Sequence, residues 1–374
     1  MAAKKPRNPL VSSAAKASAE AKKRFEADRA QRIGDQAQIL SADDMAGMYD
    51  LQRGLFTTLG GEFRPVTRDD LMAFKAAVND IQRRHGQRKG NSPVAGAAGG
   101  ILAKQVVNLS APEDRQRASR EIHTVTPVNN RGGVVHMRTN ASAKSDVTHH
   151  HVMVQFLDYD KVLADGNTTL EAAQRMVAGK VRFDCDCGRH TYWYRYIASI
   201  GNFNYGRPED GFPRVRNPKL MGIACKHVIR VMSVISAGAT FNLFAKRMIE
   251  NGRKTLSNRQ TPVTVAQQQA FIEQVEEARK KAKRGTVIRT DDEAKARREA
   301  QPAFQRQQAA RQAKATDRAA VRAANDKLRT SKAAKVNKPI KAGQHDALAT
   351  AMKAQGYSAK QIAAALKGVE KAGA

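Results

Sequence analysis

Cysteine is scarce in this chain of 374 residues, which contains three, at positions 185, 187 and 225. A disulfide framework of the kind that stabilises small secreted domains uses cysteines in pairs and forms in oxidising compartments. The odd count argues against such a framework, and we expect no secretory signal peptide. Metal binding is the alternative use of a small group of thiols, and we favour it here.

Acidic residues and long apolar runs are also few. The sequence has 35 aspartates and glutamates against 65 lysines and arginines, which gives a formal net charge of +30 and a pI near 10.4. No run of 18 or more apolar residues occurs, so the sequence predicts no membrane-spanning segment. Because a strongly basic chain attracts polyanions, we expect nucleic acid to be the partner.

The common catalytic and nucleotide-binding motifs are missing too. The sequence contains no G-x-x-x-x-G-K-[ST], G-x-G-x-x-G, H-E-x-x-H or G-x-S-x-G pattern. These absences favour a non-enzymatic protein. A transposase-like enzyme or a nuclease is the alternative, and it would require an acidic catalytic centre that neither the N-terminal part nor the basic C-terminal part supplies.

Two short patterns in the sequence are typical of metal ligands. Cys185 and Cys187 form C-x-C, and Cys225 and His227 form C-x-H further along. Three thiolates and one imidazole make a donor set that suits a single structural Zn²⁺ ion in tetrahedral geometry. His190 is the alternative fourth ligand, but His227 completes a pair with Cys225 that has no other evident purpose.

The segments around these residues indicate how the ligands are presented. Residues 180–184 alternate apolar and polar side chains as a strand does, whereas residues 224–235 have the apolar spacing of a helix. Residues two apart on a helix point in nearly opposite directions. We therefore place Cys225 in the turn before this helix and His227 in its first turn.

The order C-x-C, then C-x-H opening an apolar helix (CKHVIRVM), resembles the SWIM-type zinc finger, a strand–turn–strand–helix module. The resemblance covers about residues 178–238 and implies a role in binding nucleic acid or protein. It also implies a structural zinc ion held by Cys185, Cys187, Cys225 and His227. The interval between the pairs, 37 residues from Gly188 to Ala224, exceeds the family's usual connection. This insert resembles finger inserts of proteins encoded near the structural genes of tailed bacteriophages.

The insert combines aromatic and basic side chains. It holds the chain's only tryptophan and four of its seven tyrosines, and aromatic faces beside guanidinium groups suit a surface that stacks bases and contacts phosphates. Tyr192, Tyr194 and Tyr196 alternate along a predicted strand, and we expect Trp193 to cover the core near the metal. We expect the arginines to be exposed and to face a ligand. The predicted nucleic-acid contacts in the insert are Arg189, Arg195, Arg207, Arg214, Arg216 and Tyr194.

Basic charge is concentrated in two segments. Residues 1–33 carry nine basic and three acidic side chains, residues 279–343 carry twenty and six, and the 245 residues between them have a net charge of +8. Both basic segments lack an apolar stripe, so we expect them to be partly disordered when unbound. Nucleic acid would bind them largely irrespective of base sequence. The predicted contacts in the tail are Lys280, Lys281, Lys283, Arg284, Arg297 and Arg298.

The centre of the chain has the strongest strand signals. Residues 122–128 and 134–138 flank a glycine-containing turn, and residues 147–157 add a third strand. The third strand carries histidines 149–151, of which the first and last share a face. We interpret them as a polar strand face, with a metal role as the open alternative.

The remaining signals divide the chain into segments of an α+β fold. Ser41 and Thr67 each precede an aspartate by three residues, a capping pattern that opens helices at 42–58 and 68–85. The predicted parts are a basic arm (1–33), a helical pair (34–85), a flexible linker (86–100), a central α+β domain with the zinc finger (101–252), a helical connector (253–278), a basic tail (279–343) and a C-terminal helical pair (344–374).

These features favour a non-enzymatic, zinc-binding protein that associates with DNA or RNA. The insert's resemblance adds the hypothesis of a phage virion component, packed with the genome or ejected with it, located in the virion or in the host cytoplasm. The alternative is a scaffold or assembly protein that binds other virion proteins through its finger and its C-terminal helices. Salt-sensitive nucleic-acid binding would favour the first hypothesis, and no binding at low salt would favour the second.

Overall fold

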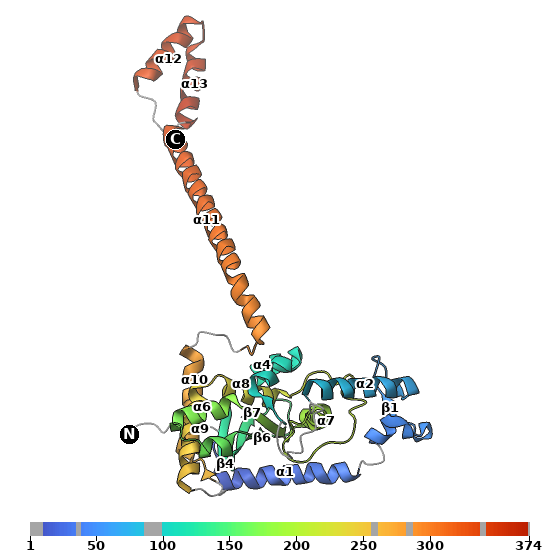
Figure 1. Cartoon of the computed structure of the whole chain (residues 1–374). Helices are drawn as coiled ribbons and strands as arrows, with labels where there is room; N and C mark the ends of the chain where they lie inside the picture. The colour runs from blue at the N-terminus through green and yellow to red at the C-terminus, as the bar shows by residue number, and fades with distance from the viewer. Residues whose placement is uncertain are drawn as a thin grey trace. The chain divides into compact units, whose positions relative to one another are not determined.

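The computed structural model describes residues 10–34, 39–85, 99–255, 261–281, 287–336 and 342–372. They belong to two compact units, residues 1–291 and residues 292–374. The described residues form many helices and two antiparallel sheets (Figure 1). The predicted α+β class is therefore confirmed.

The first unit contains a six-stranded antiparallel sheet. Its strand order is β3 (Ile101–Leu102), β7 (Lys180–Cys185), β6 (His149–Phe156), β5 (Val134–Asn140), β4 (Val125–Arg131) and β8 (Thr261–Pro262). The loop between β4 and β5 is Gly132-Gly133, and both glycines have positive φ, as a two-residue type I′ hairpin requires. The three predicted central strands are confirmed, with small shifts at their ends.

One face of this sheet is apolar and is covered by helix α8 (Lys226–Ser236). On β6, Val152, Val154 and Phe156 point to this face and are buried. α8 contacts β4, β5, β6 and β7 and buries nine of its eleven residues. The helices that surround it are α3 (Ala103–Leu109), α4 (Pro112–Glu121), α6 (Thr169–Ala178) and α9 (Ala239–Thr255). Together they bury the apolar side chains of α8 and the sheet, which is the main source of stability in this unit.

The opposite face of the sheet is polar and is covered by helix α1 (Ala14–Gly34). Figure 1 shows α1 running along the side of the sheet away from α8. Ala14, Ala17 and Ala21 are buried, and Ala14 and Ala17 pack with Val128 of β4. The prediction that the basic arm is partly disordered is wrong for residues 10–33, because this narrow row of alanines lets the helix lie close to the sheet. The first nine residues lie outside the described residues.

The predicted helix at 68–85 is confirmed as α2 (Arg68–His85). Thr67 and Asp70 cap its N-terminus, since the Asp70 carboxylate accepts hydrogen bonds from the backbone N–H and the hydroxyl of Thr67. Phe74 of α2 packs on Phe212 of the insert, with ring centroids 4.4 Å apart. This contact attaches α2 to the central domain.

The predicted helix at 42–58 is wrong. Gly47 and Gly54 adopt φ values of 119° and 61°, which an α-helix cannot accommodate. The chain instead forms a π-helical turn, a 3₁₀ turn and a small hairpin, in the order Asp44–Met48, Leu51–Arg53, β1 (Phe56–Thr57) and β2 (Arg64–Pro65). Of the predicted linker, residues 86–98 lie outside the described residues.

The insert is helical where a strand was predicted. After the C-x-C turn, the backbone N–H groups of His190 and Thr191 both donate to the carbonyl of Cys187, which starts a helical turn. The chain continues as a π-helix at His190–Tyr194 and as α7 (Arg195–Ile200). The tyrosines therefore do not share one face of a strand. These helices take the place of the second strand of the expected strand–turn–strand–helix module.

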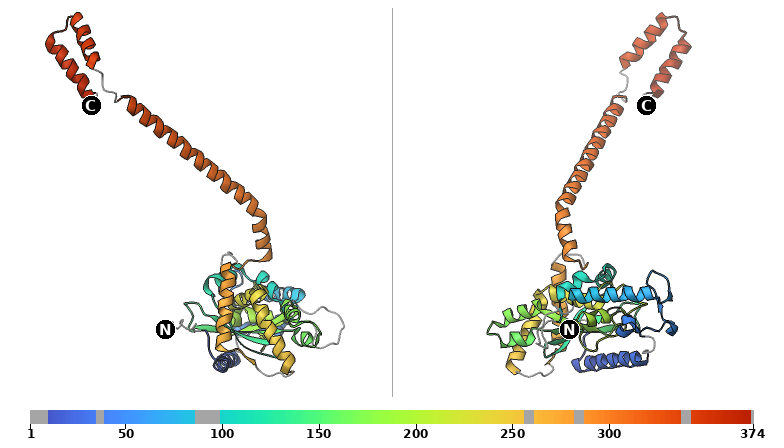
Figure 2. Two further views of the ribbon diagram at one scale, coloured as in Figure 1. Left: turned by 90° about the vertical axis from the view of Figure 1, so that its left-hand side faces the viewer. Right: turned by 45° about the vertical axis from the view of Figure 1, so that its right-hand side comes forward.

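The second unit is formed by helices. Residues 291–336 make one helix, α11 (Asp291–Val336), which corrects the expected disorder of that part of the tail. Its 46 residues span about 69 Å at 1.5 Å per residue. α12 (Ala342–Ala354) and α13 (Ala359–Ala372) lie side by side (Figure 2). They correspond to the predicted C-terminal helical pair.

Two further helices complete the first unit. α5 (Tyr159–Ala164) packs on α6 and α9, and α10 (Val265–Lys281) packs on β4 and α9. Within the described ranges, no single helix has both the length and the apolarity to cross a membrane. The pair Lys226–Ser236 and Thr240–Lys254, bent by 81°, reaches that threshold together by length and composition.

Candidate metal centre

The three cysteines and His227 come together at one end of the central sheet. Cys185 is the last residue of β7, and Cys187 follows in the turn. Cys225 occupies the N-cap position of α8, and His227 lies in the first turn of this helix, as predicted. One ligand atom from each of the four side chains lies within 4.8 Å of the others, and all four residues are buried.

The cluster fits a tetrahedral Zn²⁺ ion in size and in donor chemistry. With Zn–S and Zn–N distances of about 2.3 and 2.0 Å, neighbouring ligand atoms should be about 3.5–3.8 Å apart. The Sγ atom of Cys225 lies 4.0 Å from Nδ1 of His227. The other ring nitrogen of His227, Nε2, is buried without a hydrogen-bond partner. The four donors would form a closed site, because they fill all tetrahedral positions.

The electrostatics of the cluster favour a bound cation. Burial, together with the adjacent thiols of Cys187 and Cys225, raises the pKa of Cys185 well above its usual value. Burial opposes ionisation of Cys225 too, but hydrogen bonds from the other two cysteines outweigh it and lower its pKa. Burial lowers the pKa of His227, which keeps the ring neutral and able to ligate. A divalent cation would stabilise all three thiolates together.

His190, the alternative ligand, lies outside the cluster. Its ring is fully buried, and Nε2 is 3.0 Å from Oδ1 of Asp184. Its backbone N–H points at the sulfur of Cys187, with the nitrogen 3.4 Å from Sγ. His190 therefore supports the cluster through its backbone, while its ring belongs to an ion-pair network on the other side of β7.

Asp186, between the two cysteines of C-x-C, ties the turn to its surroundings. One carboxylate oxygen accepts from Nδ1 of His150 at 2.9 Å and from the backbone N–H of His151 at 3.0 Å. The other accepts from Nη1 of Arg24 at 3.0 Å. Burial alone would raise the pKa of Asp186, but the hydrogen bond and charge of His150, with the charges of His151 and Arg24, lower it to about 2. The ring of His150 lies 4.3 Å from that of His227.

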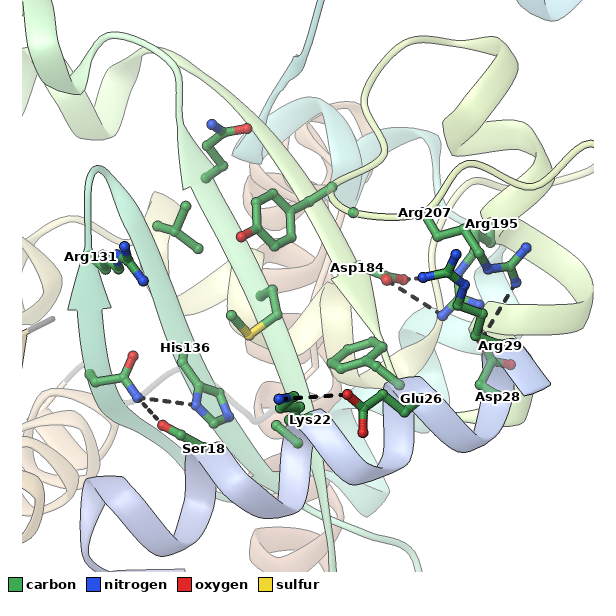
Figure 3. A pocket seen from close by; sticks show the side chains of 18 of the residues that line it. Ser18, Lys22, Glu26, Asp28, Arg29, Arg131, His136, Asp184, Arg195 and Arg207 are labelled. Atoms are coloured by element: carbon green, nitrogen blue, oxygen red, sulfur yellow. Dashed lines mark hydrogen bonds and ion pairs between the residues drawn. The ribbon is translucent and has the colours of Figure 1, made fainter. Parts of the chain in front are cut away.

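The expectation that the arginines of the insert are exposed is wrong for Arg195. Its side chain is 1 % exposed and lies between Asp184 and Asp28 (Figure 3). Nε donates to Asp184 Oδ1 at 3.1 Å, and Nη1 donates to Asp28 Oδ2 at 2.5 Å. Arg207 is half-buried, with Nη2 3.6 Å from both Asp28 and Glu209. These guanidinium groups hold α1 and the insert together.

The other residues of the insert that were predicted to contact nucleic acid are also less exposed than expected, with one exception. Tyr194 is buried and donates its hydroxyl to Asp114. Arg189 donates to the same carboxylate at 3.0 Å and stacks on Trp193, with Cζ 3.4 Å from the ring centroid. Arg214 is half-buried and donates to the carbonyl of Phe56. In this set only Arg216 is exposed. The others contact carboxylates or, for Arg214, a backbone carbonyl.

The predicted contacts of the tail are partly described. Lys280 lies exposed near the end of α10, and Arg297 and Arg298 are exposed on α11. Lys281 is the last residue of α10, and nothing is described of its side chain. Lys283 and Arg284 lie outside the described residues.

Two residues of α1 near the metal cluster, Glu20 and Arg24, were not predicted from the sequence. Glu20 lies beside His149 and His151 on the polar face of the sheet, and Arg24 reaches Asp186. The local signal in the sequence is the Glu20–Arg24 spacing of four, typical of a helix-surface ion pair. That spacing does not reveal which strand the helix covers.

A cavity of about 730 Å³ separates part of α1 from the sheet (Figure 3). Its walls include Phe25 of α1, His136 of β5 and Tyr205 of the insert. Arg195 and Asp184 form part of its lining, so the ion pairs described above fix one end of the cavity. Its volume is within the range of small-molecule sites.

Comparison of the chain with protein-family models, with curated proteins and with solved structures finds no match. What the structure shows is a buried cluster of three cysteines and one histidine with its donor atoms close enough together to bind one metal ion.

Proposed function

We propose that this chain is a non-enzymatic, nucleic-acid-associated protein whose first unit is stabilised by one Zn²⁺ ion. The ligands would be Cys185, Cys187, Cys225 and His227. The single observation that carries the nucleic-acid part is the uneven charge, since residues 279–343 have a net charge of +14 within a chain of +30. Within this segment α11 carries twelve basic and six acidic residues on one continuous helix.

A helix of this composition suits a polyanion. Lysine and arginine side chains that neutralise phosphates release the counterions of the nucleic acid, which gives affinity without base recognition. Lys280, Arg297 and Arg298 are exposed, as is Arg216 in the insert, so their side chains can contact the phosphates of a nucleic acid. We also propose Lys281, Lys283 and Arg284 as phosphate contacts on the basis of their sequence position. Arg195 and Tyr194 are not proposed as nucleic-acid contacts because they are buried.

The zinc ion would have a structural role. Four protein ligands in a buried cluster leave no coordination position for a substrate, in contrast to catalytic zinc sites with three protein ligands and a water. The ligands come from the end of β7 and the start of α8, so the ion would fix the covering helix to the sheet. Binding would therefore contribute directly to the folding free energy of the first unit.

The proposal that the protein belongs to a virion rests on fewer observations. The insert's resemblance to phage finger inserts supports a virion component packed with, or ejected with, the genome. A second candidate, a scaffold or assembly protein, is favoured by the α12–α13 pair, where Leu348 and Tyr357 are 40 % and 47 % exposed. Exposed apolar side chains on a small helical pair suit a protein partner.

Fluorescence anisotropy with labelled DNA and RNA of random sequence tests the first candidate. We expect binding by the full chain to weaken steeply between about 50 and 200 mM salt. Replacing Arg297 and Arg298 by glutamine should reduce the slope of log K against log salt by about 2, at about 1 per phosphate contact. The matched control removes two exposed arginines from α2, Arg83 and Arg84, and should leave the slope unchanged.

Two outcomes would contradict the proposal. The first is the absence of DNA and RNA binding at low salt, which would leave the scaffold candidate. The second is an equal loss of slope in the α2 control, which would show that only the net charge of the protein matters and that α11 is not the contact surface.

A further inference from the structure

A second group of potential metal ligands lies on the polar face of the sheet, beneath α1. Glu20 of α1 meets His149 and His151 of β6, and one ligand atom of each lies within 4.8 Å of the other two. Oε2 of Glu20 is 2.8 Å from Nε2 of His149 and 3.8 Å from Nε2 of His151. Ligands about 2.1 Å from a metal ion should be about 3.0–3.5 Å apart. The observed separations lie on either side of this range.

Strand geometry explains why the two histidines converge. Residues 149 and 151 are two apart on β6, so both side chains leave the same face of the sheet. His150 points to the opposite face, toward His227. The group is therefore separate from the cysteine cluster, whose ligands come from β7, the turn after it and the start of α8.

The second ring nitrogen of each histidine is already engaged. Nδ1 of His149 lies 2.9 Å from the hydroxyl of Thr148, and Nδ1 of His151 lies 2.8 Å from Nε2 of His136. Metal-binding histidines usually use the ring nitrogen remote from the metal in such a bond, which fixes the tautomer and the ring orientation. Both Nε2 atoms are thus left to face Glu20.

The buried nitrogen of His151 lacks a partner. His151 is fully buried, and its Nε2 makes no hydrogen bond in the structure. Buried polar atoms are nearly always paired, so an unpaired ring nitrogen 3.8 Å from the Glu20 carboxylate is a candidate metal donor. Burial lowers the pKa of His151 to about 3 and also lowers the pKa of His149. Both rings are then neutral at pH 7, which is the form that binds metals.

The charged side chains around Glu20, His149 and His151 affect the expected affinity of this group for a metal ion. Arg24 holds the other oxygen of Glu20, with Nη2 2.6 Å from Oε1, so the carboxylate can offer one oxygen to a metal. Arg138 of β5 is buried nearby and donates to the carbonyl of Leu10 and the hydroxyl of Ser12. These two cations oppose the binding of a further cation. We therefore expect weaker binding than at the cysteine cluster.

We propose that Glu20, His149 and His151 form a second metal site, for a divalent first-row transition ion. Two imidazoles and one carboxylate suit Zn²⁺, Co²⁺, Ni²⁺ or Fe²⁺ and are too few and too nitrogen-rich for Ca²⁺ or Mg²⁺. Three protein ligands leave at least one coordination position open. The site adjoins the 730 Å³ cavity through His136, which bonds to His151 and lines the cavity. It does not depend on the proposed nucleic-acid function.

Cobalt binding to the full chain distinguishes the two sites. Protein that holds one zinc per chain is dialysed to equilibrium against Co²⁺, and bound metal is counted by mass spectrometry. Cobalt at thiolates gives strong sulfur-to-metal charge-transfer absorption in the near ultraviolet, whereas cobalt held by nitrogen and oxygen gives only weak visible bands. We expect one additional equivalent of cobalt with visible bands and no charge-transfer band.

Substitutions then assign this equivalent to residues. Glu20→Gln keeps the size of the side chain and its bond to Arg24 through the amide oxygen, and it should weaken cobalt binding at least about tenfold. His151→Gln should do the same, with the fold checked by circular dichroism. Glu26→Gln is the matched control, because it makes the same change at an exposed position of α1 and should leave cobalt binding unchanged.

The outcomes are decisive in both directions. Loss of the additional cobalt in Glu20→Gln but not in Glu26→Gln supports the site, even if His151→Gln fails to fold. Uptake of no cobalt beyond the zinc equivalent overturns the proposal, as does an additional equivalent that Glu20→Gln binds as tightly as the unaltered chain. Failure of the cysteine cluster would instead appear as loss of the first metal and of its charge-transfer band in cobalt-substituted protein.

Discussion

Arg24 of α1 lies against Asp186, the residue between the two cysteines of the C-x-C turn, with Nη1 3.0 Å from Oδ2. The carboxylate is 1 % exposed, and Arg24 also binds Glu20 and the backbone carbonyl of His149. One guanidinium group therefore joins the N-terminal helix, the histidine strand and the proposed zinc turn. The N-terminal segment is thereby part of the folded unit and not only a source of charge.

Replacing Arg24 by glutamine should lower the free energy of unfolding by about 2 kcal/mol, because removal of one partner leaves the buried Asp186 carboxylate with fewer donors. The size is below that of a fully buried pair because the Arg24 side chain is 21 % exposed. Urea denaturation of the zinc-loaded protein measures it. Arg29→Gln, at an exposed position of the same helix, is the control and should change stability by less than about 0.5 kcal/mol. Equal effects of the two variants would contradict the role assigned to Arg24.

Cys225→Ser should release about one zinc ion per chain and destabilise the first unit by several kcal/mol, since structural zinc binding contributes directly to folding. The measurement combines metal analysis of the purified protein with thermal unfolding before and after chelation. The unaltered chain should lose stability on chelation, and the variant should be insensitive to it. A variant that retains its zinc and its melting temperature would show that the ligand assignment is wrong.

How far the sequence predicts the fold depends on whether a signal is local. The strands around Gly132-Gly133 and the helix at 68–85 were predictable because hairpin glycines and a capping aspartate act within a few residues. The failure at 42–58 has the same origin, since the apolar spacing there resembles a helix, but Gly47 and Gly54 adopt left-handed conformations that end it. Glycine is compatible with helical and with left-handed backbone conformations, so the tertiary structure determines which of the two it adopts.

The same difference between local and distant signals applies to the candidate site. Convergence of the cysteines with His227 was predictable, because thiols and an imidazole at such short spacings have few other uses. The partner of Arg195 was not, because Asp28 lies 167 positions away in the sequence. An arginine in an aromatic segment is equally compatible with phosphate contact and with a buried carboxylate. The distinction required knowing that α1 covers this face of the sheet.

Asp70 should make stability depend on pH in the acidic range. The hydrogen bonds from Arg64, at 2.6 and 2.9 Å, lower the pKa of Asp70 from 3.8 to about 2, although burial opposes the shift. A carboxyl group with a lowered pKa stabilises the folded state above the unfolded pKa, and this contribution declines as pH falls from about 4 to about 2. Asp70→Asn should thus cost about 1 kcal/mol at pH 7, after allowance for solvent screening of the pair.

The check on Asp70 is the difference in unfolding free energy between the unaltered chain and Asp70→Asn at pH 7, 5 and 3. The difference should be the same at the first two values and smaller at the third. Use of a difference removes the effect of zinc release at low pH, which affects both proteins alike. A difference that grows as the pH falls would contradict the assigned pKa shift.

Substitutions of Arg195 and Arg216 distinguish a structural arginine from a surface arginine within the same insert. Arg195→Gln should lower the free energy of unfolding by about 3–5 kcal/mol, because it leaves Asp184 and Asp28 without their shared guanidinium partner in a buried position. Arg216→Gln removes the same group from an exposed position and should change stability by less than about 0.5 kcal/mol. Denaturant unfolding gives both values, and anisotropy titrations at low salt give the accompanying change in nucleic-acid affinity.

Arg216→Gln should weaken nucleic-acid binding while the fold is retained. If Arg195→Gln kept full stability and lost nucleic-acid affinity, Arg195 would belong to the binding surface after all.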